Sequence, residues 1–231
     1  MSGHDVLGLG VMPGGAEREP DCVAAIHEED GTGRWLYPAT APLFPVWRVA
    51  DRAVYAIEMR PPDARLIAID TATGDTRCRS GWFTGTPADL VVTDAAAFLR
   101  TTDHHLYAVD PGDGRVLWDR PGITRSPTVA NGRVFLVENA RRLAVVEPAS
   151  GEDRWPGKPG KGVLLAGPFV TDRTVCTVGH DGLTARNAET GRVIARHAMS
   201  LNPDCRGVPA LVDGVLYFTN GRREVEAVAL G

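Results

Sequence analysis

Residues 106–118 read LYAVDPGDGRVLW. Apolar residues alternate up to Val109, an acid follows at Asp110, glycine stands four residues after the acid, and tryptophan eight residues after it. Such alternation is typical of a β-strand, and an acid followed closely by glycine is typical of a tight turn. The segment therefore predicts two short strands joined by a turn.

The same skeleton recurs along the whole chain. With Asp110 as the anchor, the equivalent anchors are His27, Asp70, Glu147, Asn187 and Ala229, separated in chain order by 43, 40, 37, 40 and 42 residues. The glycine recurs at Gly31, Gly74, Gly151 and Gly191. The tryptophan recurs at Trp35 and Trp155, whereas Cys78 and Ala195 stand in its place in two copies. A period near 40 residues indicates a repeat architecture.

A second pair of alternating runs precedes each anchor. In residues 123–162 the four expected strands are 127–130, 133–138, 142–147 and 152–155, and we name these strand positions A to D. Asn131-Gly132 and Asp213-Gly214 are strong hairpin turns between positions A and B, because both central residues need a positive φ. No window keeps the apolar spacing of a helix. Four short strands per 40 residues are typical of a β-propeller blade.

The sequence thus predicts an all-β fold, a β-propeller of four-stranded antiparallel blades with about six repeats. We expect one domain over 1–231, with repeats at approximately 1–40, 41–84, 85–122, 123–162, 163–204 and 205–231. Residues 6–11 look like position B, so the first repeat lacks A, and the last repeat lacks D. Either the chain is a fragment of a seven- or eight-bladed ring, which we favour, or it forms a compact six-bladed or open ring with two three-stranded blades.

The pattern L-x-A-[VI]-D-x-x-x-G-x-x-x-W, with S-P-x-V-x-x-G-x-[VI]-[YF] upstream, resembles the PQQ-like (quinoprotein-type) β-propeller repeat. The resemblance extends from about Val6 to the C-terminus, and its best copy runs from Ser126 to Trp155. It implies that each tryptophan packs against the neighbouring blade, so that Trp35, Trp118 and Trp155 are architectural. Cys78 and Ala195 would then mark weakened contacts between blades.

The resemblance also implies what a quinone-binding member needs: a vicinal cysteine pair, an aspartate base and a calcium-binding set of Glu and Asn. The four cysteines are Cys22, Cys78, Cys176 and Cys205, and no two are adjacent or form a C-x-x-C pair. We therefore expect no cofactor, no metal and no catalytic residue. A Cys176–Cys205 disulfide is an alternative only for an exported chain.

Several polar clusters are interpreted as solvated turns. His104-His105 and the motif around His180-Asp181 fall in predicted B–C turns about two blades apart, too far to share a metal. Arg141-Arg142 and Arg222-Arg223 also fall in B–C turns and would discourage edge-to-edge association of sheets. Residues 157–162 lack the spacing of a phosphate-binding loop and are expected to connect two blades.

A net charge of −4 argues against a nucleic-acid partner, and no apolar run approaches the ~18 residues of a membrane span. The N-terminus has no signal peptide, which favours the cytoplasm unless an upstream segment is missing. The leading hypothesis is a non-enzymatic interaction or ligand-sensing module. Its unknown protein partner or small ligand would bind on one ring face, or at a channel mouth lined by A strands.

The resemblance implies such roles, since relatives include a propeller lipoprotein of the outer-membrane assembly machinery and sensor parts of bacterial Ser/Thr kinases. The first role is disfavoured because no lipobox is present, and the chain has no kinase motif. The alternatives are a remnant of a quinoprotein-type, PQQ-dependent oxidoreductase and a degraded gene product without independent function.

Overall fold

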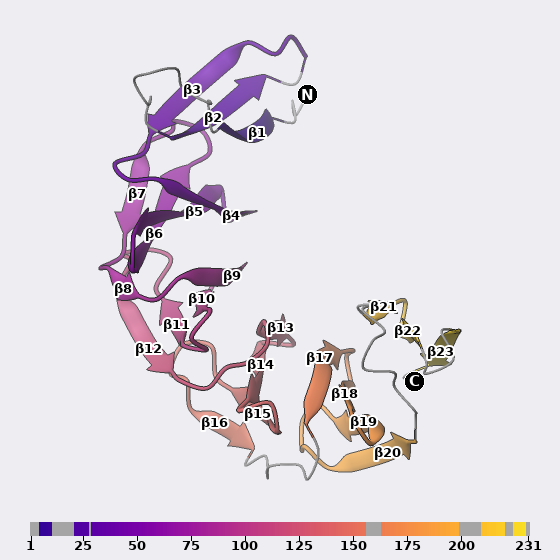
Figure 1. Cartoon of the computed structure of the whole chain (residues 1–231). Coiled ribbons are helices and arrows are strands. Elements are labelled where there is room, and N and C mark those ends of the chain that lie inside the picture. Colours follow the sequence, from indigo (N-terminus) through magenta and orange to yellow (C-terminus); the bar gives the residue numbers. More distant parts are fainter. Residues whose placement is uncertain are drawn as a thin grey trace. The chain divides into compact units, whose positions relative to one another are not determined.

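The computed structural model describes residues 5–10, 21–27, 29–155, 163–198, 209–219 and 224–229. The chain divides into two compact units, Met1–Arg120 and Pro121–Gly231. Each unit contains three antiparallel sheets in the described residues (Figure 1). The described part contains no helix that is long and apolar enough to cross a bilayer.

The sheets of unit 1 follow the chain. Its strands are β1 (Asp5–Gly10), β2 (Cys22–His27), β3 (Gly33–Pro38), β4 (Leu43–Ala50), β5 (Ala53–Arg60), β6 (Asp63–Asp70), β7 (Thr76–Arg79), β8 (Phe83–Thr84), β9 (Pro87–Val92), β10 (Ala97–Thr101), β11 (Leu106–Val109) and β12 (Val116–Arg120). They pair as β1-β2-β3, β4-β5-β6-β7 and β9-β10-β11-β12, and the short β8 also pairs with β6.

Unit 2 repeats this plan. Its strands are β13 (Thr128–Ala130), β14 (Arg133–Glu138), β15 (Arg142–Val146), β16 (Asp153–Trp155), β17 (Leu164–Val170), β18 (Thr174–Gly179), β19 (Gly182–Asn187), β20 (Val193–His197), β21 (Ala210–Val212), β22 (Val215–Thr219) and β23 (Val225–Ala229). They pair as β13-β14-β15-β16, β17-β18-β19-β20 and β21-β22-β23.

The predicted blade is confirmed, since all four expected strands of residues 123–162 match β13 to β16 to within a residue or two. The prediction for the terminal repeats is also confirmed for the described residues. There the first sheet holds positions B, C and D, and the last sheet holds A, B and C. The single domain and the closure of the ring stay predictions.

The core lies between neighbouring sheets, because the middle strands are covered on both faces. In β5, residues 53–58 are all buried, which explains why a B strand is apolar almost throughout instead of strictly alternating. One cluster, containing Tyr55, Leu66 and Leu99, joins the second and third sheets of unit 1. In unit 2 an equivalent cluster contains Phe135 and Trp155. Outer strands are more exposed, and Ile194 in β20 is 56% exposed.

The five C–D turns among the described residues share one geometry. In each, the glycine N–H donates to the carbonyl of the anchor residue at 2.9 Å, and the anchor N–H donates to the carbonyl five residues later. Each glycine has a φ between 70° and 79°, and each turn follows a register shift in the C–D pairing. A positive φ explains the glycine, because other residues adopt that conformation at a cost.

Candidate functional site

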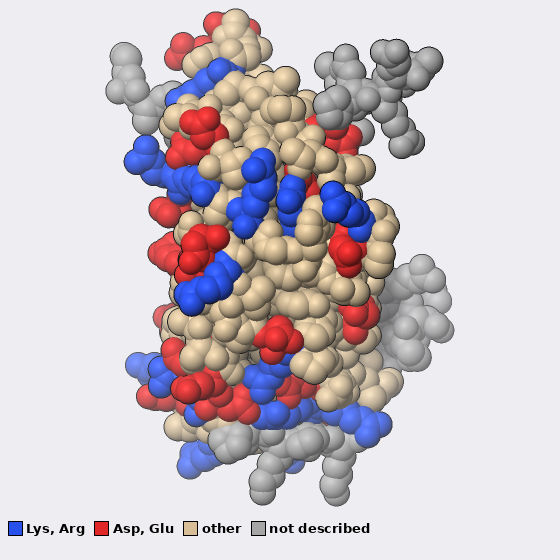
Figure 2. All heavy atoms as spheres, turned by 90° about the vertical axis from the view of Figure 1, so that its left-hand side faces the viewer, with Lys and Arg blue, Asp and Glu red and all other residues tan. Residues whose placement is uncertain are grey.

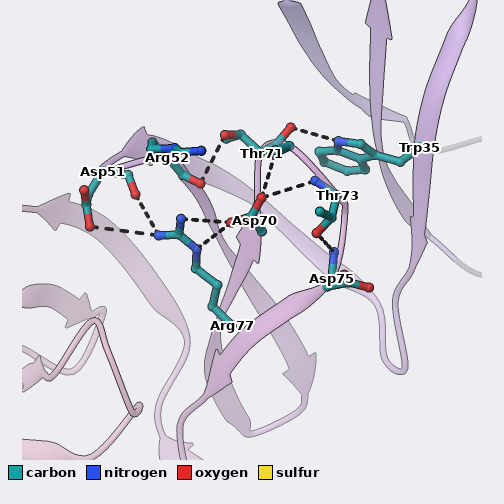
Figure 3. Close-up of polar contacts among 9 residues, drawn as sticks. Trp35, Asp51, Arg52, Asp70, Thr71, Thr73, Asp75 and Arg77 are labelled. Atoms are coloured by element: carbon teal, nitrogen blue, oxygen red, sulfur yellow. Dashed lines mark hydrogen bonds and ion pairs between the residues drawn. The ribbon is translucent and has the colours of Figure 1, made fainter.

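The repeat tryptophan packs against the neighbouring blade, and Figure 3 shows this contact for Trp35 in β3. Its Nε1–H donates to the carbonyl oxygen of Thr71 at 2.9 Å, and its ring lies against Gly74, where an added Cβ would be 2.8 Å from a ring carbon. Both partners belong to the C–D turn of the next blade. The predicted architectural role of Trp35 is therefore confirmed.

The same turn is fixed by charge and by main-chain contacts (Figure 3). Asp70 accepts a hydrogen bond from the N–H of Ala72 at 2.7 Å and two from Arg77, at 3.0 and 2.9 Å. The backbone bond from Ala72 and then the bonds from Arg77 hold the pKa of Asp70 below its ordinary value. Arg77 also donates to the carbonyl of Asp51 at 2.7 Å, so it ties the C–D turn to the A–B turn.

Trp155 makes the corresponding contact in unit 2 in a modified form. Its ring lies against Gly191, where an added Cβ would be 2.7 Å from a ring carbon. Its buried Nε1 has no hydrogen-bond partner among the described residues. The carbonyl of Ala188, equivalent to that of Thr71, accepts from Arg133 instead, at 3.1 Å. The next blade after Trp118 belongs to the other unit, so the predicted contact of Trp118 stays a prediction.

The two replaced tryptophans behave differently. At Cys78 the expected weakening is wrong, because the thiol is buried in the core and donates to the carbonyl of Pro111 at 3.5 Å. A Cβ on Gly114 would lie 2.5 Å from the carbonyl oxygen of Arg79, so the backbones of the two blades themselves are in contact. At Ala195 the expectation is confirmed, since this residue is exposed and lines a pocket.

The opposite end of unit 1, formed by B–C turns and D–A connections, carries an aromatic and basic cluster. Trp82, which follows β7, is partly buried. The guanidinium of Arg65 lies 4.6 Å from the centroid of the Trp82 ring, and that of Arg60 lies 4.8 Å from it. Guanidinium groups at these distances interact favourably with an indole face. We call Arg60, Arg65 and Trp82, with the ring stack described next, the Trp82 cluster.

Three rings stack beside Trp82. Phe83 packs on Tyr107 with centroids 4.7 Å apart, and Tyr107 packs on His105 with centroids 4.6 Å apart. The Tyr107 hydroxyl donates to the carbonyl of Thr84 at 3.3 Å, and His105 Nε2 lies 2.7 Å from a carboxylate oxygen of Asp119. Burial is the main cause that raises the pKa of Tyr107 above its ordinary value. Polar contacts therefore hold the middle ring, Tyr107, and the His105 end of the stack.

A buried carboxylate positions Arg65. Glu58 is 0% exposed and accepts from the Nε–H of Arg65 at 2.6 Å. It also accepts from the backbone N–H and the hydroxyl of Thr40, at 2.8 and 3.0 Å. Thr40 lies in the D–A connection from β3 to β4, so Glu58 links two blades and fixes a guanidinium above Trp82. A buried charge needs this degree of compensation.

The two predicted histidine-containing B–C turns lie where expected. His104 and His105 lie between β10 and β11, and His180 and Asp181 lie between β18 and β19, in different units. Arg142 is not a solvated turn residue as expected: it begins β15 and pairs with Glu138 and Asp153, at 2.8 and 2.5 Å. Arg222, Arg223, Cys205 and residues 157–162 lie outside the described residues.

The described residues do not fit a quinone with calcium. Cys78 and Cys176 are each buried in an apolar core, and no vicinal cysteine pair exists in the sequence. In the part of the chain that the structure describes, no three His, Cys, Asp or Glu side chains are grouped to hold a metal ion.

The charge on the outer side of unit 1 is mixed. Figure 2 shows acidic and basic side chains interspersed over the side of unit 1 that carries β3, β7 and β12. Part of this charge is neutralised by pairs such as Arg77 with Asp70, at 2.9 Å. Nucleic-acid binding needs a basic surface of one sign, and this side does not provide it.

Comparison with protein families agrees with the repeat geometry. The family described as outer membrane protein assembly factor BamB matches residues 18–230. The chain belongs to the BamB family of PQQ-like propellers. Among solved structures it is similar to BamB from Moraxella catarrhalis, with a TM-score of 0.65 and 16% identity, over 90% of this chain and 64% of that one. The chain thus spans less than two thirds of that BamB.

Other propellers are similar in fold alone. Hsv2 from Kluyveromyces lactis matches with a TM-score of 0.64 and 11% identity, over 92% of this chain and 69% of that one. A europium-containing methanol dehydrogenase matches with a TM-score of 0.56 and 11% identity, over 87% of this chain and 58% of that one. No protein with a curated description matches the sequence. Membership of the BamB family and the propeller fold are therefore established.

Sequence reasoning missed the Trp82 cluster in this BamB-family chain. Trp82 stands four residues after Cys78, outside the repeat skeleton, so the repeat gave it no role. One signal was available: Trp82 precedes Phe83 in a D–A connection, and only Phe83 belongs to the core between blades. A polar or glycine-rich composition is the usual one for such a connection.

Proposed function

We propose that this protein is a non-enzymatic interaction module and that a polypeptide partner binds at the Trp82 cluster. The observation that carries the proposal is a partly buried indole contacted by two guanidinium groups. Trp, Tyr and Arg provide most of the binding energy at protein interfaces, and here all three types gather at one end of unit 1. The family description, an assembly factor for outer membrane proteins, supports the same class of function.

The chemistry of the cluster favours a partner segment with an acidic side chain next to an apolar one. Arg65 is already paired with Glu58, whereas Arg60 is exposed and forms no ion pair with any described residue. A carboxylate on Arg60 would place the neighbouring apolar side chain over Trp82. Because Glu58, Thr40 and the ring stack hold the cluster in place, little conformational entropy would be lost on binding.

The test compares capture of partners by the full chain and by two variants. Immobilised wild-type protein is exposed to a lysate of the organism that encodes it, and the captured proteins are quantified by mass spectrometry. We expect Trp82→Ala to reduce capture of the specific partner at least about tenfold, as for a residue at the centre of an interface. Leu36→Ala is the matched control, because Leu36 is an apolar residue of unit 1 that is 63% exposed and lies outside the cluster.

Equal capture by wild type and Trp82→Ala would reject the cluster as the binding surface. The enzymatic alternative needs a separate assay, in which pyrroloquinoline quinone and calcium are added and dye-linked alcohol oxidation is followed. Oxidation above the protein-free rate would reject the non-enzymatic assignment. The cytoplasmic location stays a prediction, while the family description favours a compartment outside the cytoplasm, and cell fractionation distinguishes the two.

A further inference from the structure

A pocket of about 580 Å³ opens in unit 2 between the sheet β17–β20 and strand β23. Its apolar wall includes Leu183, Ile194 and Val228, and its polar rim includes Arg196 and His197. Its volume lies in the range of about 300–1,000 Å³ that small-ligand pockets occupy.

The pocket lies where the repeat would place a tryptophan. Ala195 occupies the repeat position of Trp35 and Trp155, whose indoles fill the corresponding space between blades. It lines the pocket with only a methyl group. The space left beside it is therefore suited in shape to a planar ring of about indole size.

An ion pair between the anchor and strand D, which two other blades contain, is also missing here. Arg77 pairs with the anchor Asp70, and Arg154 pairs with the anchor Glu147. In the fifth blade the equivalent position of the arginine is Ile194, which is 56% exposed. The fifth blade therefore lacks both the indole and the anchor–arginine pair.

The rim of the pocket is basic. Arg173 and Arg196 both line it, and neither forms an ion pair with a carboxylate of the described residues. Burial, and then the nearby charge of Arg196, lower the pKa of Arg186. Positive charge is thus left without an acidic partner next to an apolar wall, and a ligand with a negative group would compensate it.

We propose that this pocket binds a small aromatic carboxylate. The ring occupies the space beside Ala195, in contact with Leu183, Ile194 and Val228. The carboxylate lies at the rim, where Arg173 and Arg196 donate to it. This site is separate from the Trp82 cluster, so either proposal can fail without the other.

The experiment uses the full chain and two probes in isothermal titration calorimetry. Indole-3-propionate carries the ring and the carboxylate, and 3-methylindole carries the ring alone. A ligand of this size is expected to bind with a Kd of about 0.1–1 mM. We expect the neutral probe to bind more weakly, because it leaves the arginines without a partner.

Two variants locate the site. Ala195→Trp fills the pocket with the chain's own indole and should weaken binding of both probes at least about tenfold. Arg196→Gln should weaken indole-3-propionate about three- to tenfold and change 3-methylindole less than about twofold. Val116→Trp is the control for an added tryptophan, because Val116 lies on an outer strand of unit 1 and is 40% exposed; its binding should equal that of the wild type.

Absence of binding by indole-3-propionate up to its solubility limit would overturn the proposal. An unchanged affinity of Ala195→Trp for indole-3-propionate would also overturn it. So would a loss of affinity in Val116→Trp as large as that in Ala195→Trp. If Ala195→Trp fails to fold by circular dichroism, Arg196→Gln decides, because an exposed arginine can be replaced without loss of the core. An equal effect of Arg196→Gln on both probes would then reject the carboxylate contact.

Discussion

The ring of Trp35 occupies the space in which a side chain at position 74 would lie, so only glycine fits there. Gly74 has a φ of +78° as well, and an added Cβ would be 2.8 Å from the ring. Gly31 stands at the same place in the preceding repeat, with a φ of +71° and no described atom within 4 Å of an added Cβ. Substitutions at the two glycines therefore distinguish the cost of backbone strain, present at both, from the cost of displacing the indole, present only at Gly74.

Gly31→Ala should lower the free energy of unfolding by about 1–2 kcal/mol, the cost of a left-handed conformation for alanine. Gly74→Ala should cost about 1–3 kcal/mol more, because the indole must move. Urea unfolding of both variants measures the difference. Equal costs at the two positions would mean that the indole does not press on Gly74.

The two indole N–H groups should differ in NMR spectra. Trp35 Nε1–H has an acceptor at 2.9 Å, whereas buried Trp155 Nε1–H has none among the described residues. We expect the Trp35 resonance downfield of the Trp155 resonance in a ¹H–¹⁵N spectrum, since hydrogen bonding deshields the proton. Trp35→Phe and Trp155→Phe assign the peaks. A Trp155 resonance as far downfield as that of Trp35 would show that the Trp155 N–H does have a hydrogen-bond acceptor.

Glu58→Ala should be strongly destabilising, by about 3–5 kcal/mol, because it leaves the Arg65 guanidinium and the Thr40 N–H without their buried partner. Glu58→Gln keeps an oxygen for Thr40 but replaces the acceptor of Arg65 by an amide NH2 group, so its cost should be smaller than that of Glu58→Ala, which removes both acceptors. Denaturant titration compares the two. A cost below about 1 kcal/mol for Glu58→Ala, the range of exposed pairs, would contradict the network.

The same substitution should have opposite effects at the two replaced tryptophan positions. Cys78→Trp adds a ring where the backbone of Arg79 already meets Gly114, so it should lower the free energy of unfolding by about 1–3 kcal/mol or more. Ala195→Trp enters an open pocket and should leave Tm unchanged or higher. Differential scanning fluorimetry measures both, and a stabilising Cys78→Trp would refute the backbone contact.

Cys176 should be unreactive in the folded protein. Burial raises the pKa of its thiol to about 11, and only the thiolate reacts with alkylating reagents. We expect peptide mapping after N-ethylmaleimide treatment at neutral pH to find Cys176 unmodified until the protein is unfolded by denaturant. Modification of Cys176 without denaturant, as fast as in its presence, would contradict the burial.

The raised pKa also sets the sign of a pH effect on stability. The unfolded thiol titrates near 8.5 and the folded one near 11, so the stability that this group contributes is present below about pH 8.5. It is lost as the pH rises toward 11. Cys176→Ala should therefore flatten the fall in stability over this interval. If the free energy of unfolding of Cys176→Ala falls as steeply with pH as that of the wild type, other titrating groups cause the fall.

The blades could be predicted from sequence because the repeated glycine is required by the backbone conformation of the C–D turn. A glycine with positive φ stands four residues after five of the six anchors, whatever the anchor residue is. Side-chain identity at the anchor matters less, since the turn of His27 and that of Asp70 have the same main-chain bonds. Period and glycine together therefore predict the strands.

The candidate sites could not be predicted in the same way, because they lie where the repeat is broken. Trp82 is additional to the skeleton. Its two guanidinium neighbours come from the hairpin of β5 and β6, which lies next to Trp82 only after folding. Cys78 and Ala195 are equivalent in sequence, yet one is buried and the other lines a pocket. How far neighbouring backbones close over a small residue is a tertiary property.

The main-chain bonds of the C–D turn have a consequence for evolution. Because N–H and C=O groups hold the turn in all five blades, a mutation of the anchor or of the outer tryptophan leaves the strand connection standing. The side chains at one contact between blades can therefore change in evolution while the main-chain bonds of the other blades keep the fold. Asn187 and Ala195 illustrate such a change in one blade, and new ligand specificities can arise there without rebuilding the protein.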